Sequence, residues 1–447
     1  MAFEIISIAD KSAIKVAQLV ENKAFGDKVW TNEFCRAVHM INQVLKGSYN
    51  LILESQASKT GGVKAERYVS LCSPIDISYM PDEILELLPP YKSSMILTDP
   101  NDPRHQHIQS FLQRVGETLH QAASAARNVG ESDNSVESVK SLVTTIGTYL
   151  TSYGLRNKQF GNAQTAYSSM QSTKRMYDGQ RKHHRSIFMG AVTIHHQNRL
   201  SSMNYYRVRS NLDDRLILNM LEFSLSPFTR IRRSAQAYLE LIARIYRGTW
   251  VLCFPTLFDA LQQGTDPDRM KGALYVLRYN AVGISRIGRT LNWYQGHLVR
   301  LVECLLSAHH ETKASIQALV TKSIEELLGS MREPTSAIVE YRVEAVDKAI
   351  DSMVEVLRYK PDADIVERFN SNIRKVKAAQ DEQWDILVDR VIAIASQPQL
   401  NWRYVLSASR ILLQVQRRDR PTDVRMAKFH SQAMSNAHPK LRDYAIA

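Results

Sequence analysis

The chain has 447 residues, and its 44% share of hydrophobic residues is sufficient for a buried core, which excludes a mostly disordered protein. Its formal net charge of +12 favours an anionic partner such as nucleic acid, an inositol phosphate or an acidic protein surface, although many soluble helical proteins are mildly basic without a specific partner. No stretch approaches the roughly 20 apolar residues that span a bilayer, and no secretory signal is visible, so we expect a location in the cytosol or nucleus.

Residues 1–153 are predicted to form an N-terminal helical segment with an irregular connector. Apolar residues recur at helical spacing from Asp10 to Leu45, which predicts two helices joined around Gly26. Further helices are predicted at 107–129 and 136–150. Residues 68–108, between the first two helices and these two, are predicted to contain an extended run, a short helix ended by two prolines, and a turn-rich connector.

Residues 154–186 are predicted to form a basic loop. Its cationic residues are opposed only by Asp178, and Tyr177 lies among them. Lys and Arg side chains together suit phosphate oxygens, so the loop is a candidate site for an inositol phosphate or another anion. A solvated loop, or a surface that pairs with acidic residues of another repeat, is the alternative. The candidate anion-binding residues are Lys174, Arg175, Arg181, Lys182, His183, His184 and Arg185.

From Asp213 onward the pattern predicts antiparallel helices joined by a turn at Ser226 and Pro227. The second helix places aliphatic and small residues on one inner face, with Arg232 beside it. A similar order of proline, aliphatic-basic pair and alanine follows Pro267 and Pro439. The predicted repeat-packing residues are Ile231, Arg232, Ala235, Leu239, Leu441, Arg442 and Ala445.

These patterns return at spacings close to the roughly 40–47 residues of HEAT and armadillo units. A helix pair cannot bury its apolar face alone and must stack on its neighbours. The sequence therefore predicts an all-α fold, a HEAT/armadillo-like α-solenoid of stacked antiparallel helix pairs, with residues 187–447 as a repeat array that is uncapped at its C-terminal end. An irregular helical bundle is the alternative.

The prolines and charged residues of this array have expected structural roles. We expect each proline to end or kink the helix before it, and the basic residue that follows to pair with an acidic group or helix end of the next repeat. Arg207 and Arg209 precede an acidic helix start, which predicts internal salt bridges. The sign-alternating run from Arg417 to Arg425 is typical of a solvated loop between repeats.

No arrangement of residues predicts catalysis or metal binding. His310 and Glu311 begin like HExxH, but Ala314 stands where the second histidine is needed. Adjacent histidines on a helix point in different directions, so the pairs at 183–184, 195–196 and 309–310 do not predict a chelate. We expect no enzyme activity and no metal site. The cysteines follow no CxxC pattern and are predicted to be small buried residues in a reducing compartment: Cys35, Cys72, Cys253 and Cys304.

The stretch from Asn204 to Glu333 resembles the giant HEAT-repeat proteasome activators of the Blm family. The resemblance is carried by the runs DDRLILNMLEFSLSPFTRIRRSAQAYLELI, DRMKGALYVL and HHETKASIQALV. It continues more loosely through WDILVDRVIAIASQPQLNWRYVLSASRILL to HPKLRDYAIA.

The resemblance implies a segment of an activator that is not itself a peptidase. Members of the family form a dome over the core proteasome, bind its α ring and open its gate for ubiquitin-independent degradation. The family is associated with the nucleus and cytoplasm, acetylated histones and DNA repair. No cofactor is required, but basic openings in the dome hold inositol phosphates, which makes the loop at 154–186 a candidate. We expect no direct nucleic-acid contact and no membrane association.

Two features of the family have no match. Members end in a tail with a penultimate Tyr or Phe, where this chain has Ile446, and their acetyl-lysine-reading region has no counterpart. Members are also several times longer, so we expect an internal fragment or a truncated gene model. The alternative is another HEAT scaffold, such as a nuclear transport receptor; the basic balance of charge counts against it, because an acidic concave face favours transport.

Overall fold

A computed structural model describes the chain in two compact units, Met1–Leu252 and Cys253–Ala447, whose boundary falls within helix α12 (Thr249–Asp259). Within the described residues the secondary structure is helical apart from two strands of two residues each. The described residues are 2–22, 24–48, 53–54, 92–93, 103–128, 133–151, 165, 169, 209–246, 248–279, 283–288, 296–307, 313–331, 348, 351–352, 363–417 and 421–446.

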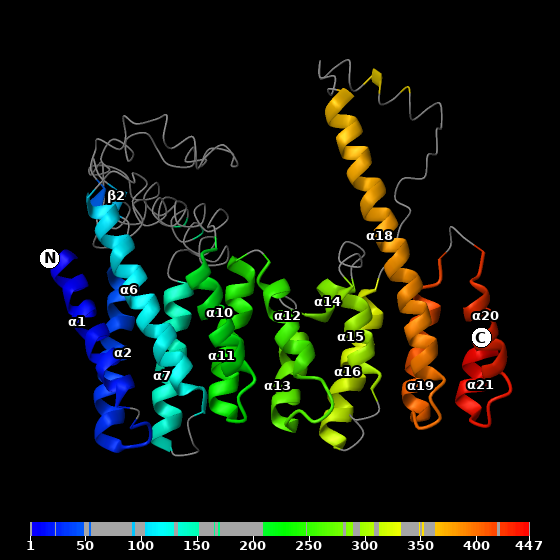
Figure 1. Cartoon of the computed structure of the whole chain (residues 1–447), viewed down its shortest axis with the longest axis horizontal. Coiled ribbons are helices and arrows are strands. Elements are labelled where there is room, and N and C mark those ends of the chain that lie inside the picture. Colours follow the sequence, from blue (N-terminus) through cyan, green and yellow to red (C-terminus); the bar gives the residue numbers. More distant parts are fainter. Residues whose placement is uncertain are drawn as a thin grey trace. The chain divides into compact units, whose positions relative to one another are not determined.

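The described residues of the first unit form three helix pairs (Figure 1). The first pair is α1 (Ala2–Glu21) and α2 (Lys28–Ser48). The second is α6 (Pro103–Ala125), which continues into a 3₁₀ turn (Ala126–Asn128), and α7 (Asp133–Thr151). The third is α10 (Asn211–Ser224) and α11 (Thr229–Ile245). The helices predicted at 10–45, 107–129 and 136–150 are thus present, with α1 and α6 beginning several residues earlier than the periodicity indicated, whereas the short helix predicted before Pro89 lies outside the described residues.

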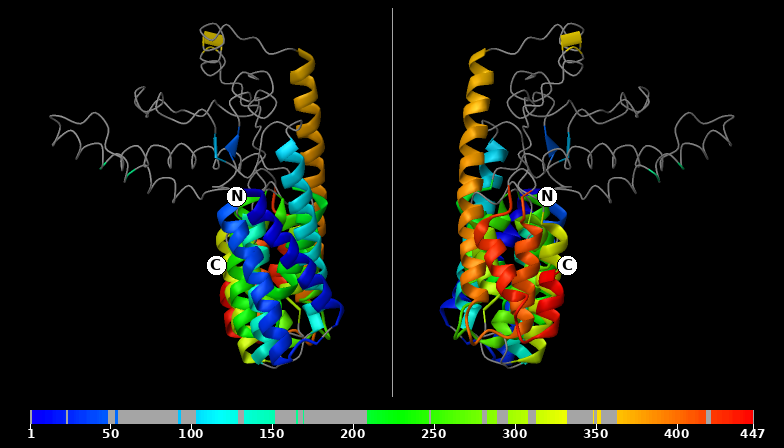
Figure 2. Two further views of the ribbon diagram at one scale, coloured as in Figure 1. Left: turned by 90° about the vertical axis from the view of Figure 1, so that its left-hand side faces the viewer. Right: turned by 90° about the vertical axis from the view of Figure 1, so that its right-hand side faces the viewer.

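The described helices of these three pairs form two layers. Helix α6 packs between α1 and α10, whereas α7 packs between α2 and α11. Figure 2 shows α1 and α2 side by side at the N-terminal edge of the unit. The first unit runs to Leu252 and includes described helices on both sides of the predicted segment boundaries at 153 and 186, and those boundaries stay predictions.

Apolar side chains between the two layers make the core of the first unit. Phe34, Ile41, Phe111 and Leu119 are fully buried there. Buried hydrogen bonds tie helices together at their ends: the Trp30 indole donates to the Leu19 carbonyl at 2.9 Å. Packing of one amphipathic face against neighbours on both sides is what stabilises helices of this length.

The strands β1 (Leu53–Glu54) and β2 (Lys92–Ser93) pair antiparallel. Leu53 lies opposite Ser93, and Glu54 lies opposite Lys92. They join segments 38 residues apart in sequence, counted from 54 to 92, between the first and second helix pairs.

The second unit is also built from paired helices. After α12 come α13 (Pro267–Leu277), α14 (Ile284–Ile287), α15 (His297–Leu305) and α16 (Ala314–Ser330). They are followed by α18 (Ala363–Ala395), α19 (Trp402–Gln414), α20 (Val424–Ala433) and α21 (Pro439–Ile446).

Neighbouring helices of the second unit again fall into two sets. In one set α15 packs on α18, and α18 packs on α20; in the other α13 packs on α16, α16 on α19, and α19 on α21. Helix α12 meets α15 through the Phe254 and His297 rings, whose centroids are 4.9 Å apart. The short helix α14 packs against α16.

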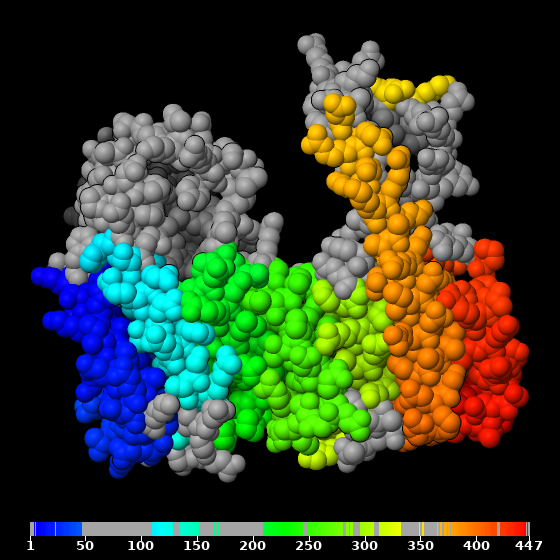
Figure 3. Space-filling model, viewed as in Figure 1, coloured from blue at the N-terminus to red at the C-terminus, as the bar shows by residue number. Residues whose placement is uncertain are grey.

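Helix α18, 33 residues long, is the longest described helix. Its C-terminal half packs against neighbours and buries Trp384, Leu387 and Val391. Its N-terminal half extends beyond α15, α16 and α19 (Figures 1 and 3). The described side chains from Asp364 to Ala378 are exposed or half-buried.

Two prolines of the second unit, Pro267 and Pro439, begin helices. Pro267 is the first residue of α13, where the Asp266 side chain caps the backbone N–H groups of Asp268 and Arg269. Pro439 is likewise the first residue of α21. The expectation that these prolines end or kink the preceding helix was wrong, because the first helical position needs no N–H donor and already requires the backbone angle that proline imposes.

None of the described helices is long and apolar enough to cross a membrane.

Candidate functional site

The predicted anion-binding residues lie outside the described part of the chain. This applies to all seven, Lys174, Arg175, Arg181, Lys182, His183, His184 and Arg185. It applies also to Cys72 and to the histidine pairs at 195–196 and 309–310. The site is therefore built from the described helices alone.

The predicted repeat-packing residues of α11 lie on its buried face. Ile231, Ala235 and Leu239 are each at most 3% exposed, and Arg232 is 5% exposed beside them. The Arg232 guanidinium donates to the carbonyls of Ser226 and Pro227, at 2.8 and 3.1 Å. This guanidinium therefore caps the carbonyl groups at the turn that joins α10 to α11.

The same arrangement recurs at the start of α21. Leu441 is buried, Ala445 is half-buried, and Arg442 donates to the carbonyls of Asn436 and Ala437 at 2.9 and 3.1 Å. In both helices the acceptors are six and five residues before the arginine. The partner is the turn within the same helix pair and not an acidic group of the next repeat, because the guanidinium points back along its own helix toward the unsatisfied carbonyls there.

A second device links the first helices of successive pairs. In each case an arginine forms an ion pair with an Asp or Glu of the preceding first helix. The pairs are Arg114 with Asp10, Arg215 with Glu117, Arg300 with Asp259, Arg390 with Glu303, and Arg425 with Asp385 and Asp389. We call this series the arginine ladder. Most of these side chains are exposed, so each pair contributes only about 0–1 kcal/mol to the free energy of unfolding. Their recurrence at equivalent positions is therefore more informative about the architecture than their energy.

The arginine ladder has a sequence signature that the sequence analysis missed. Helices α6 and α15 both carry Arg-x-x-Glu, as Arg114 with Glu117 and as Arg300 with Glu303. Residues three apart lie on the same helix face. The arginine can therefore reach back to one neighbouring helix while the glutamate receives an arginine from the other.

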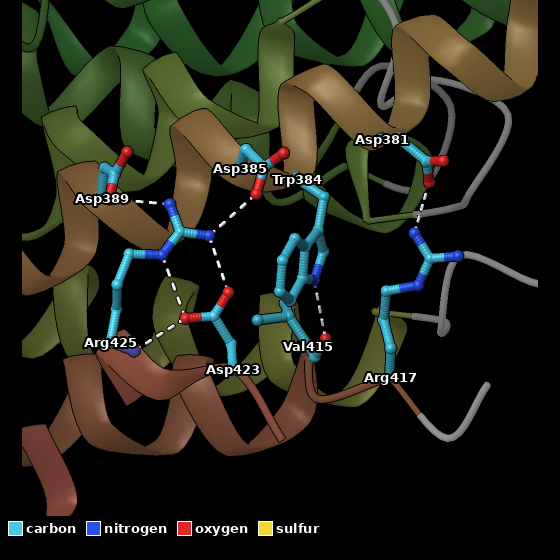
Figure 4. A network of polar contacts seen from close by, with 8 residues as sticks. All are labelled: Asp381, Trp384, Asp385, Asp389, Val415, Arg417, Asp423 and Arg425. Carbon is cyan, nitrogen blue, oxygen red and sulfur yellow. Dashed lines mark hydrogen bonds and ion pairs between the residues drawn. The ribbon is translucent and has the colours of Figure 1, made fainter. Parts of the chain in front are cut away.

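The densest part of the ladder is the contact between α18 and α20 (Figure 4). Asp381, Asp385 and Asp389 lie four residues apart along one face of α18. Arg425 meets Asp385 at 2.7 Å, Asp389 at 2.9 Å and Asp423 at 2.8 Å. The hydrogen bond from Arg425 lowers the pKa of Asp423, and the surrounding carboxylates raise the pKa of Arg425. This network fastens the α20–α21 pair to α18.

Arg417 completes the network from the end of α19. Its side chain is only 3% exposed and pairs with Asp381, and beside it the Trp384 indole donates to the Val415 carbonyl at 2.9 Å. The prediction of a solvated loop from Arg417 to Arg425 was therefore wrong at both described ends, because the acidic partners are on α18, about 36 residues earlier in the chain. The predicted internal salt bridge at Arg209 is confirmed, to Asp214 at 2.5 Å.

A cavity of about 380 Å³ lies on another face of α18, where it meets α15 and the end of α12. The side chains of Arg300 and Arg390 at its rim are 51% and 65% exposed. Both arginines already pair with acidic residues of the ladder, and apolar side chains, among them Leu261, Val299 and Ile386, also line the cavity. Its polar lining includes Gln262, Arg300, Glu303, Cys304, Gln383 and Arg390.

Burial shifts the pKa values of two groups near this cavity, Cys304 and His297. Burial raises the pKa of the Cys304 thiol to about 11, so the thiol stays protonated and unreactive at neutral pH. Burial lowers the pKa of His297, which favours the neutral imidazole. Cys253 is fully buried, as predicted for a small apolar residue, whereas Cys35 is half-buried.

Across the described ranges, no group of three or more His, Cys, Asp or Glu side chains is placed to hold a metal ion. The polar contacts described above are ion pairs between helices and arginine caps on turn carbonyls.

Comparison with known proteins does not assign the chain. No protein-family model matches it, and no curated protein shows significant sequence similarity to it.

Proposed function

We propose that the chain is a non-catalytic interaction scaffold with the architecture of a HEAT/armadillo-like α-solenoid. The observation that supports this most directly is the recurrence of the same two devices in both units. Arg232 in the first unit and Arg442 in the second each cap the two carbonyls at equivalent positions of their own turn. The arginine ladder runs from each first helix to the preceding one in both units. Stacked pairs held by repeated contacts are the plan of a solenoid.

The partner we propose is the α ring of the core proteasome, bound by the complete protein as a gate-opening activator in the nucleus and cytoplasm. This part of the proposal rests on the sequence resemblance between Asn204 and Glu333. A scaffold of stacked helices suits the role, because it presents a broad surface and needs no reactive side chain. Turnover of acetylated histones and a role in DNA repair are the processes that the resemblance attaches to such an activator.

The test is co-sedimentation and peptide hydrolysis with the natural full-length gene product that contains this sequence. We expect it to sediment with purified core proteasome and to increase hydrolysis of a fluorogenic peptide. Core particles whose α-subunit gate has been removed are the matched control, and the protein should not stimulate them further. Absence of both association and stimulation would refute the proteasome partner and leave the scaffold proposal to its own test.

We also propose that the loop at 154–186 binds an inositol phosphate. Five of its seven Lys and Arg side chains lie close together in sequence: Lys174, Arg175, Arg181, Lys182 and Arg185. Replacing these five by Gln should abolish saturable binding of inositol hexakisphosphate in calorimetry. A variant with five exposed cations of described helices replaced, at equal net charge, should bind as the unmodified protein does. Unchanged binding in the loop variant would refute the loop as the site.

A further inference from the structure

The ends of α19 and α21 carry a basic and aromatic surface that the ladder does not use. Helices α19 and α21 pack together, and both begin at the same end of the second unit (Figure 1). Trp402 opens α19, while His438 and Lys440 flank the first residue of α21. The Trp402 and His438 rings stack with centroids 4.1 Å apart and an interplanar angle of 18°.

Two exposed cations sit on this aromatic pair. The Arg403 guanidinium lies 5.6 Å from the centroid of the Trp402 ring, and the Lys440 ammonium lies 5.4 Å from it. Both side chains are exposed, and Trp402 is half-buried. Cation–π contacts of this kind hold each of the two charges beside the same indole ring.

Acidic residues are scarce around these cations. Helix α19 contains no Asp or Glu, nor do the turns at 396–401 and 434–438, and Asp443 is the one acidic residue of α21. Within the described residues, no ion pair joins Arg403 or Lys440 to a carboxylate. The contrast with Arg425, which contacts three aspartates on the other side of the unit, is clear.

The backbone beneath the surface is held in place. Arg442 caps the carbonyls of Asn436 and Ala437, and the Asn436 side chain accepts from the His438 N–H at 2.9 Å. On the other side, the Asn401 side chain accepts from the Arg403 N–H at 3.1 Å. A preorganised surface loses less conformational entropy when it binds a partner.

We infer that this surface, formed by Trp402, Arg403, His438 and Lys440, docks an acidic segment of a partner protein. Carboxylates two residues apart in an extended segment are about 6.6 Å apart, a spacing that two cations around one indole ring accommodate. Stacking of nucleic-acid bases is disfavoured, because the Trp402 ring already stacks on His438. The inference does not depend on which larger assembly the chain belongs to.

The test is fluorescence anisotropy of a labelled twelve-residue peptide of alternating Glu and Gly, titrated with the whole chain at low salt. The double variant Arg403→Gln/Lys440→Gln should weaken binding at least tenfold. The matched control is Lys375→Gln/Lys377→Gln on the exposed part of α18, which changes net charge equally and should keep binding within twofold. Equal weakening in both variants, or none in either, overturns the inference.

Two further variants separate docking from folding and from nucleic-acid binding. Arg403→Lys keeps the charge and should retain binding within about threefold, with an unchanged far-UV circular dichroism spectrum. Lys440→Glu reverses one exposed charge and should weaken binding more than Lys440→Gln. A twelve-nucleotide single strand should bind more weakly than the peptide. Tighter binding of the nucleic acid, lost in the double variant, would assign the surface to phosphate groups and overturn the inference.

Discussion

At the scale of single residues, the same kind of arginine–carbonyl contact occurs at one buried arginine and at one more exposed arginine. Arg232 and Arg442 donate to carbonyls at equivalent positions of their own turns, six and five residues earlier, at nearly equal distances. Arg232 is 5% exposed, whereas the contacts of Arg442 are exposed. The bonds that Arg232 makes are part-buried, so water replaces them only in part when the guanidinium is lost.

The two arginines should therefore differ in their contribution to stability. We expect Arg232→Leu to lower the free energy of unfolding of the first unit by about 2–3 kcal/mol, and Arg442→Leu to lower that of the second unit by under about 1 kcal/mol. Denaturant titration followed by hydrogen exchange of α11 and α21 measures both. Arg233→Leu, at an exposed neighbour, is the control and should change stability by about 0.5 kcal/mol or less. Equal costs at the two arginines would contradict this account.

Asp423 gives the second unit a predictable acid response. Its pKa is lowered by Arg425, so its contribution to stability is present above the unfolded-state pKa of about 3.9 and is lost as pH falls through the lower, folded-state value. Asp423→Asn keeps an N-cap side chain for α20 but removes the charge. The variant should be less protected than the unmodified chain in hydrogen exchange of α20 at pH 5, and the difference should shrink below pH 3.

A matched control for Asp423 is Asp443→Asn on α21, a change of equal charge at an exposed residue. This control should leave the exchange of α20 unaltered at both pH values. If Asp423→Asn and the unmodified chain differed equally at pH 5 and pH 3, the ion pair with Arg425 would not be the source of the effect.

At the scale of helices, two glycines permit close approach between neighbours. A Cβ added at Gly147 of α7 would lie 2.3 Å from the Tyr238 ring of α11. A Cβ added at Gly116 of α6 would lie 2.6 Å from the Leu212 side chain of α10. Glycine costs a helix about 1 kcal/mol relative to alanine, so both positions give up helix propensity to bring helices together.

Gly147→Ala should consequently destabilise the first unit although alanine is the better helix former. We expect a loss of about 1–3 kcal/mol from overpacking, measured by denaturant titration. The double variant Gly147→Ala/Tyr238→Ala should cost less than the sum of the two single variants, because the truncated ring leaves space for the new methyl group. Additive costs would show that α7 and α11 do not meet as described. Gly329→Ala is the control, since no atom lies within 4 Å of its added Cβ.

At the scale of the whole molecule, the same plan of paired helices and repeated arginine contacts is found in both units. In a solenoid each pair contacts only its neighbours, so stability is local and a defect spreads only to adjacent pairs. In a bundle with one shared core, loss of any contact weakens every helix. This difference decides between the solenoid and the irregular bundle.

Arg425→Ala provides the corresponding measurement. In a solenoid, hydrogen exchange should accelerate in α20, α21 and the C-terminal half of α18, while α13 and α16 keep their protection within about twofold. Arg374→Ala, which removes an exposed pair with Glu367 on the same helix, should leave all of these helices unchanged. A uniform loss of protection throughout the second unit would favour the bundle.

The sequence by itself determined the helical class and most helix positions of the described residues. Apolar residues at helical spacing around Ile231 and Leu239 are sufficient for that, because burial of one face requires that period in any tertiary context. It also marked Arg232 and Arg442 as equivalent positions, since the same order of residue types surrounds both.

Only the tertiary structure decided which partners these side chains meet. Arg417 and Arg425 read as a solvated run because their aspartates lie about 36 residues earlier on α18, and no local pattern encodes that approach. The surface at Trp402 and Lys440 likewise joins residues 38 apart in the chain. Periodicity specifies which face of a helix is buried, whereas the packing of helices specifies which charges face each other across it.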